Sequence, residues 1–149
     1  MRRVMFSILQ SACAVLSIAP VMAYGQAQMP VFIESAAQDT VGSRLAYAIR
    51  EKVRQSSGFA LVTTTDGALF RIGLVTLDPN ANASTAGYST IYSVVLTAWR
   101  PQTKTWTYIN KFVGNCGSAR VNECAESVMA EADKASDVPR NFYKTLTKK

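Results

Sequence analysis

One stretch decides the fold of this chain: YSTIYSVVLTAWRPQTKTWTYINKFV, residues 88–113. Its first half alternates between two faces, one with Tyr92, Val94, Leu96 and Ala98 and the other with Ile91, Ser93, Val95, Thr97 and Trp99. After a turn at residues 101–104, the second half alternates again, with Trp106, Tyr108, Asn110 and Phe112 against Thr107, Ile109, Lys111 and Val113. A period of two on both sides of a turn predicts a long antiparallel hairpin.

The segment before the hairpin begins with a strand and a helix. The apolar residues 31–33 predict the strand. Asp39 or Thr40 can cap the helix, because a side-chain oxygen there accepts from the free N–H groups of the first turn. The helix carries an apolar stripe at 3.6-residue spacing: Val41, Leu45, Ala48, Ile49 and Val53.

Two more strands are expected between this helix and the hairpin, at residues 59–62 and 68–77. In the second of these, Phe70, Ile72 and Leu74 share one face. Asp66 and Gly67 lie between the two apolar runs and are a tight-turn signal. We therefore expect residues 59–77 to form a second hairpin.

Helical spacing returns after the long hairpin, from about Ser118 onward. The apolar stripe there consists of Val121, Cys124, Ala125, Val128, Met129 and Ala132. Asp137 can cap a last short helix with Pro139 in its first turn.

These elements predict an α+β fold: a mostly antiparallel sheet of about five strands with two main helices packed on one face. We expect a single domain at residues 31–149, after a short flexible leader at residues 24–30. A chain of this size can bury a core of its own.

Residues 1–23 predict a cleaved secretory signal peptide of the Sec type. Arg2 and Arg3 precede an apolar run at residues 4–19, and Val21 and Ala23 provide the small-residue cleavage site. Cleavage after Ala27 is the alternative. Lipidation of Cys13 is disfavoured, because Gln10 stands where a lipobox needs leucine or a similar residue. We therefore expect a periplasmic or secreted protein with no transmembrane segment after cleavage.

Cys116 and Cys124 are the only cysteines that follow the signal, and in an exported protein such a pair predicts a disulfide. Closing the loop between Cys116 and Cys124 stabilises the folded chain by about 2.5 kcal/mol in the chain-entropy model. The rival interpretation is a redox-active or metal-binding pair. Redox motifs use closer spacing, and metal sites need more than two ligands.

The composition argues against several functional classes. The chain has no histidine, which removes the usual general base, the usual zinc ligand and every Ser-His-Asp triad. We expect no catalytic residue, no metal site and no cofactor. Without the signal, the chain has 14 basic and ten acidic residues, a net charge of +4 that is scattered and does not predict nucleic-acid binding.

The hairpin region carries six aromatic residues: Tyr88, Tyr92, Trp99, Trp106, Tyr108 and Phe112. Alternating aromatics pack across a half-buried hairpin, and they can also form a binding platform. Packing is the favoured interpretation. If there is a platform, its candidate residues are Trp99, Arg100, Trp106 and Tyr108.

Residues 31–62, with the helical segment LAYAI and the later segment SGFALV, resemble the opening of small bacterial envelope modules such as the amino-terminal domain of TolB. The resemblance implies a role in protein–protein contact in the envelope. We expect a protein-binding module whose partner is another envelope or extracellular protein. The alternatives are a secreted inhibitor or effector-like protein acting on a partner enzyme, and a hydrolase with an unrecognised site. A rigid loop at residues 78–87 would favour the inhibitor.

Overall fold

The computed structural model describes residues 28–146, and the side chains of residues 28–141. The predicted signal peptide at residues 1–23 and residues 24–27 of the leader lie outside the described residues. In chain order the elements are β1 (Met29–Ala37), α1 (Thr40–Gln55), β2 (Phe59–Val62), β3 (Phe70–Leu77), β4 (Ser89–Arg100), β5 (Thr105–Gly117) and α2 (Val121–Leu146).

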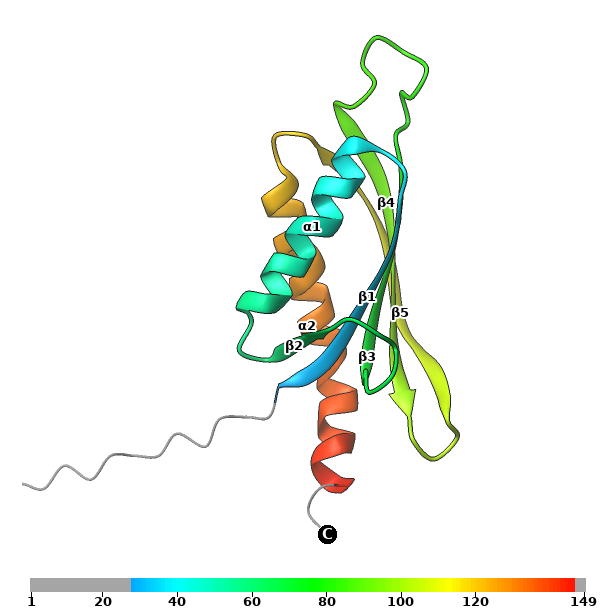
Figure 1. Ribbon diagram of the computed structural model, residues 1–149, viewed down its shortest axis with the longest axis vertical. Coiled ribbons are helices and arrows are strands. Elements are labelled where there is room, and N and C mark those ends of the chain that lie inside the picture. The colour runs from blue at the N-terminus through cyan, green and yellow to red at the C-terminus, as the bar shows by residue number, and fades with distance from the viewer. Residues whose placement is uncertain (1–27, 147–149) are drawn as a thin grey trace, which may run out of the picture.

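The five strands form one mixed sheet in the order β2-β1-β3-β4-β5. β1 is parallel to both β2 and β3, whereas the β3–β4 and β4–β5 pairs are antiparallel. Both helices pack on the same face of this sheet (Figure 1). The predicted α+β fold, with two helices on one face, is confirmed.

The core fills the space between the sheet and the two helices. α1 presents its predicted stripe to this space, with Leu45, Ile49 and Val53 fully buried. The sheet contributes alternate residues of each inner strand, among them Ile72 of β3 and Leu96 of β4. Burial of this one face in each strand leaves the other face of the sheet without a helix over it (Figure 1).

The predicted hairpin at residues 59–77 is wrong. Its two strands exist as β2 and β3, but they lie on opposite sides of β1 and run parallel to it. The physical reason is α1: a helix of 16 residues carries the chain back to the starting end of β1, so the next strand enters in the same direction. Gly67 does turn the chain, with a φ of 81°, and the loop then crosses β1, where the Leu69 N–H donates to the Pro30 carbonyl at 2.9 Å.

The predicted break before a last short helix is also wrong, because α2 runs without interruption to Leu146 and contains Pro139. Asp137 is an exposed residue inside the helix, not a cap. Ala132, Ser136 and Pro139 continue the buried stripe at helical spacing, so burial against the core outweighs the local cost of proline. The Ser136 hydroxyl donates to the Asp133 carbonyl at 2.7 Å.

The long hairpin is confirmed as β4 and β5, but a bulge alters its faces. The register shifts between Leu96 and Thr97, so that Ile109 is an extra residue in β5. Trp106 and Tyr108 therefore face away from the helices, whereas the predicted members of the same set, Asn110 and Phe112, lie on the helix side.

None of the helices in residues 28–146 has the length and apolar character that a membrane-spanning segment needs.

Candidate binding surface

The sheet face that no described helix covers is the candidate functional surface, and we call it the open face. Its residues alternate along each strand with the core residues. They are Phe32, Glu34 and Ala36 of β1, Arg71, Gly73, Val75 and Leu77 of β3, Ile91, Ser93, Val95, Thr97 and Trp99 of β4, and Trp106, Tyr108, Lys111, Val113 and Asn115 of β5.

Five aliphatic side chains of the open face form a contiguous patch around Ser93. This aliphatic patch consists of Val75, Leu77, Ile91, Val95 and Val113. Their exposed fractions run from 38% for Val95 to 71% for Val113. Single exposed apolar residues are ordinary on protein surfaces, but a contiguous apolar group is typical of a site that contacts another molecule.

An aromatic pair lies at the other end of the open face, next to the β4–β5 turn. Trp99 and Trp106 are cross-strand partners whose ring centroids are 5.6 Å apart with their planes tilted by 60°. The Arg71 guanidinium lies over the Trp106 ring, 5.6 Å from its centroid, and pairs with the Glu34 carboxylate at 3.3 Å. Tyr108 is exposed beside them. This arrangement is rigid, because both rings and the guanidinium have partners within the chain.

The structure brings together three of the four predicted surface residues: Trp99, Trp106 and Tyr108. Arg100 is the next residue along β4 and by alternation belongs to the opposite face. Arg100 and Trp99 both line a cavity of about 400 Å³ with Val138 and Pro139 of α2. Arg71 was not among the residues predicted for this surface. Its position over Trp106 depends on the pairing of β3 with β4, and no local sequence pattern predicts that pairing.

The remaining aromatics of the hairpin serve other purposes. Tyr92 is buried on the helix side, and burial raises the pKa of its phenol. Its ring lies against Gly114, where an added Cβ would approach the ring to 2.4 Å. Phe112 packs at the margin of the core, and Tyr88 is exposed before β4. The packing interpretation therefore holds for Tyr92 and Phe112 but not for Tyr88.

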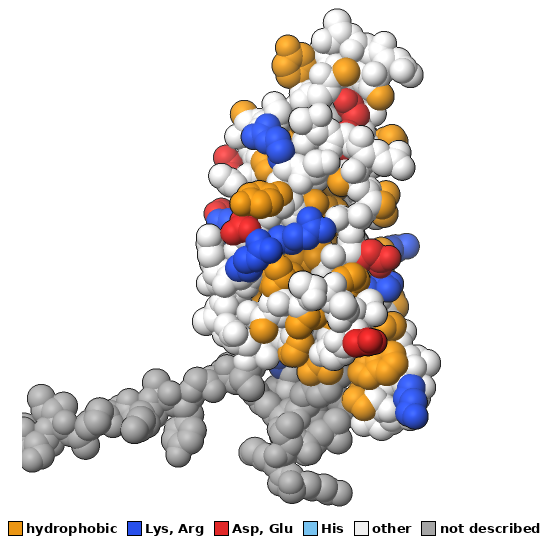
Figure 2. All heavy atoms as spheres, viewed as in Figure 1, with side chains coloured by type: hydrophobic (Ala, Val, Ile, Leu, Met, Phe, Trp, Pro, Cys, Tyr) orange, Lys and Arg blue, Asp and Glu red, His pale blue; other side chains and the backbone are white. Residues whose placement is uncertain are grey.

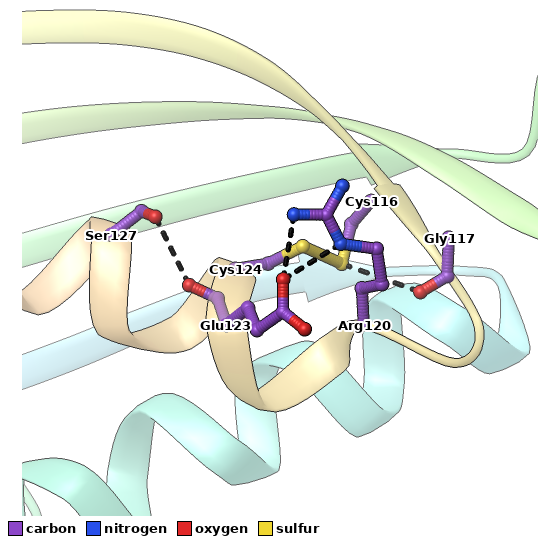
Figure 3. Close-up of polar contacts among 6 residues, drawn as sticks. All are labelled: Cys116, Gly117, Arg120, Glu123, Cys124 and Ser127. Carbon is purple, nitrogen blue, oxygen red and sulfur yellow. Dashed lines mark hydrogen bonds and ion pairs between the residues drawn. A yellow bond between two sulfur atoms is a disulfide. The ribbon is translucent and has the colours of Figure 1, made fainter.

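The predicted disulfide between Cys116 and Cys124 is present, with the two Cα atoms 6.1 Å apart (Figure 3). It joins the end of β5 to the first turn of α2, and Cys116 is fully buried. Beside it, Arg120 forms an ion pair with Glu123 at 2.6 Å. The disulfide thus holds α2 against the sheet at the edge strand, and its buried position indicates a structural role.

Asp39 is the N-cap of α1 and also connects the helix to the sheet. Its carboxylate accepts from the Gly42 N–H at 2.7 Å, from the Thr76 hydroxyl at 2.7 Å and from the Thr90 hydroxyl at 3.0 Å. Burial alone would raise the pKa of Asp39, but the hydrogen bonds outweigh it and the pKa is lowered. The carboxylate is fully engaged by donors, which is the arrangement of a structural cap.

The loop between β3 and β4 projects from one end of the sheet (Figure 1). Asp78 holds it from within, because its carboxylate accepts from the Asn80 N–H at 2.8 Å and from the Gly87 N–H at 2.7 Å. Ala86 adds a turn by donating to the Ala83 carbonyl at 3.0 Å. The loop is therefore internally ordered.

A cleft of about 850 Å³ lies on the helix side, between α1, α2 and the start of β2. Two ion pairs line it: Lys52 with Glu126 at 2.6 Å, and Arg140 with Asp133 at 3.1 Å. The Arg140 guanidinium also lies over the Phe59 ring, 4.7 Å from its centroid. The Lys52–Glu126 pair joins α1 to α2, and the Arg140–Phe59 contact joins α2 to β2.

Charges elsewhere do not concentrate into one strong field. In Figure 2 the basic side chains of the visible side lie in separate small groups, with acidic side chains beside several of them. Within the part of the chain that the structure describes, no three His, Cys, Asp or Glu side chains lie close enough together to hold a metal ion.

No protein-family model matches the chain, and no curated protein matches its sequence. Solved structures with a similar arrangement include a DUF330 protein from Xanthomonas campestris, at 10% identity and a TM-score of 0.46, covering 85% of this chain and 94% of that one. PelC from Paraburkholderia phytofirmans, solved as a dodecamer, has 8% identity and a TM-score of 0.47, covering 74% of this chain and 89% of that one. A hypothetical protein from Chlamydia trachomatis has 9% identity and a TM-score of 0.41, covering 59% of this chain and 70% of that one.

Proposed function

We propose that this chain is an exported, non-catalytic protein-binding module of the cell envelope, in the periplasm or outside the cell, that binds its partner with the open face. The observation that carries the proposal is the aliphatic patch on a sheet face that no described helix covers. A solvent-facing side of an antiparallel sheet ordinarily carries polar residues. Val75, Leu77 and Val113 are each more than half exposed instead.

Two features support the envelope location. Residues 1–23 have the charge, apolar run and cleavage site of a secretory signal. The Cys116–Cys124 disulfide is of the kind that forms and persists in oxidising compartments. The resemblance of residues 31–62 to envelope modules such as the TolB amino-terminal domain implies the same class of partner, another protein.

The absence of histidine from the sequence supports a non-catalytic role, because the commonest proton carrier of active sites is missing. Asp39, the carboxylate with a shifted pKa, is occupied by its three donors. The open face supplies apolar area and aromatic rings, which suit recognition of a protein surface.

Photo-cross-linking in the envelope of the source cell tests this proposal. A photoreactive phenylalanine analogue is placed at Val113 on the open face and, as the control, at the exposed Tyr47 on α1. We expect discrete adducts from position 113 and none of comparable yield from position 47. Equal labelling from both positions, or none from position 113, contradicts a binding role for the open face.

The second candidate is a secreted inhibitor or effector-like protein, which the ordered loop between β3 and β4 favours. Asp78 pins the loop at Asn80 and Gly87, so it projects as a preformed element. The same photoreactive group at the exposed Ser84 distinguishes the two functions. Adducts from position 84 with none from position 113 favour insertion of this loop into a partner enzyme.

A further inference from the structure

We propose that the open face binds a second copy of this chain, forming a two-fold dimer whose axis runs parallel to the strands between β3 and β4. The inference rests on the proposed function, in which the open face is the binding surface, and it names the partner. Such an axis lays the two sheets face to face, as in sandwiches whose strands are closely aligned. The interface is isologous, with the same surface used twice.

The consequences of this axis follow from the strand order. A rotation about a line parallel to the strands keeps each residue at its level along the sheet but reverses the order of the strands. β1 of one copy then lies over β5 of the other, and β3 lies over β4. We call a row of paired residues across β1, β3, β4 and β5 a level. Each level of one copy faces the same level of the second copy in reverse order, so the two rows must be complementary.

At the level of Gly73 the match combines charge and shape. Reading across the strands, this level is Glu34, Gly73, Val95 and Lys111. Its reverse puts Glu34 opposite Lys111 of the second copy, and Gly73 opposite Val95 of the second copy. Lys111 forms no ion pair with any residue that the structure describes, although it is exposed. Glu34 is exposed beside Arg71 and can accept a second cation.

Gly73 provides the space that Val95 requires. The nearest atom to an added Cβ at Gly73 is the Val95 carbonyl oxygen of its own sheet, at 3.6 Å. The position above Gly73 is therefore an open hollow between larger neighbours. The Val95 side chain, which stands above the sheet on β4, fits this hollow of the opposite copy, as side chains interdigitate between packed sheets.

The next level repeats the pattern with small and large residues. It reads Ala36, Val75, Ser93 and Val113 across the four strands. Reversal puts Val75 opposite Ser93 of the second copy, and Val113 opposite Ala36 of the second copy, so every valine meets a small side chain. One level further, Leu77 lies opposite Ile91 of the second copy.

The match is lost when the axis moves onto β3. Gly73 would then face Gly73 of the second copy, which leaves a gap, and Val75 would face Val75, which makes a collision. With the axis between β3 and β4, no two like charges meet at these three levels. The whole aliphatic patch becomes buried, and its exposure in the single chain is explained.

The first experiment measures the molar mass of the mature chain, starting at Tyr24, by light scattering after size exclusion. We expect twice the mass of one chain. Val95→Glu puts a charge into the Gly73 hollow and should give a monomer. Tyr47→Glu is the control, because Tyr47 is 62% exposed on α1, on the helix side of the sheet, and this variant should remain a dimer. Lys111→Glu, which opposes Glu34 of the second copy, should weaken the dimer without touching any aliphatic contact.

The second experiment tests the orientation. Ala36 and Val113 are three strand spacings apart within one sheet, about 14 Å, but they face each other across packed sheets about 10 Å apart. A bis-maleimide that spans about 10 Å, the distance between packed sheets, should couple the double variant Ala36→Cys/Val113→Cys into covalent dimers in high yield. Each single cysteine variant should give little dimer, because the axis does not bring either position near its own copy.

Several results overturn the inference. A wild-type monomer at the highest soluble concentration does so, as does a dimer that persists in folded Val95→Glu, or a ring or filament in place of a dimer. Circular dichroism establishes whether each variant is folded, and Lys111→Glu decides the question if Val95→Glu is not. If the chain is monomeric but position 113 still cross-links to another envelope protein, the dimer is contradicted and the proposed function is not.

Discussion

Gly42 lies against Thr76, so closely that a Cβ added to Gly42 would come within 1.9 Å of the Thr76 hydroxyl oxygen. This contact is where the first turn of α1 meets β3. The same turn is capped by Asp39, which also accepts from Thr76. A helix start, a strand and a partly buried carboxylate thus share one small volume, in which even a methyl group does not fit.

Replacing Gly42 with alanine should therefore destabilise the fold, although alanine is the better helix former. Helix propensity alone would stabilise by about 1 kcal/mol, whereas overpacking costs about 1–3 kcal/mol and disturbs the cap. Urea unfolding measures the free energy. Gly117→Ala is the control, because nothing lies within 4 Å of an added Cβ there. A stabilised Gly42→Ala variant would show that the first turn can move away from β3.

Asp39→Ala should lower the free energy of unfolding by about 1–2 kcal/mol at neutral pH, through loss of the N-cap. The pKa of Asp39 in the folded protein lies below its ordinary 3.8, so its contribution is present above pH 3.8 and is lost as the pH falls through the folded value. The difference between wild type and variant should shrink as the pH is lowered from 5 to 2, within roughly the range where such carboxylates titrate.

Asp137→Ala provides the comparison for Asp39→Ala. The sequence suggests that Asp137 caps a helix, but the structure places it exposed inside α2. Its removal should leave the free energy of unfolding almost unchanged, because it makes no cap. A loss as large as that of Asp39→Ala would restore the separate final helix.

Replacing Cys116 and Cys124 together with alanine should lower stability by about 2–4 kcal/mol, from lost loop constraint and lost packing. The fold should persist at low temperature, since the remaining core is that of a full-sized domain. Chemical denaturation checks the magnitude. Thiol labelling of the native protein checks the disulfide itself, and two reactive thiols would be incompatible with the structural role.

Trp99 and Trp106 should be coupled by about 0.5–1.5 kcal/mol beyond their separate burial, as aromatic pairs in this geometry are. A double-mutant cycle with Trp99→Ala and Trp106→Ala measures this term. The cycle of Trp99→Ala with Tyr47→Ala on α1 is the control and should be additive. Additivity in the first cycle would mean that the two rings contribute only their area.

Local patterns in the sequence predict most elements of this protein. The two-residue period of β4, the 3.6-residue stripe of α1 and the Asp39 cap all depend on near neighbours, and the structure confirms them. The pairing of Cys116 with Cys124 could also be predicted, since they are the only cysteines after residue 23. The α+β class and the helices on one face could be predicted from the same signals.

Tertiary structure alone decided the direction and order of the strands. β2 could pair with β3 in a hairpin, or the two strands could lie on opposite sides of β1. The outcome depends on where α1 returns the chain, and the sequence of the turn at Gly67 does not indicate this. Burial likewise kept α2 continuous through Pro139 against its local signal. Side chains that are distant in sequence pack in the same core, and the arrangement that buries them best depends on all of them together.

The candidate surface shows the same division. The sequence by itself determined that Trp99, Trp106 and the exposed valines lie in strands with two faces. Only the tertiary structure decided which face stays open, through the bulge at Ile109 and the placing of both helices on one side. The physical reason is that alternation specifies two faces but not their surroundings. Which face meets solvent depends on where the helices pack, and that is a property of the assembled chain.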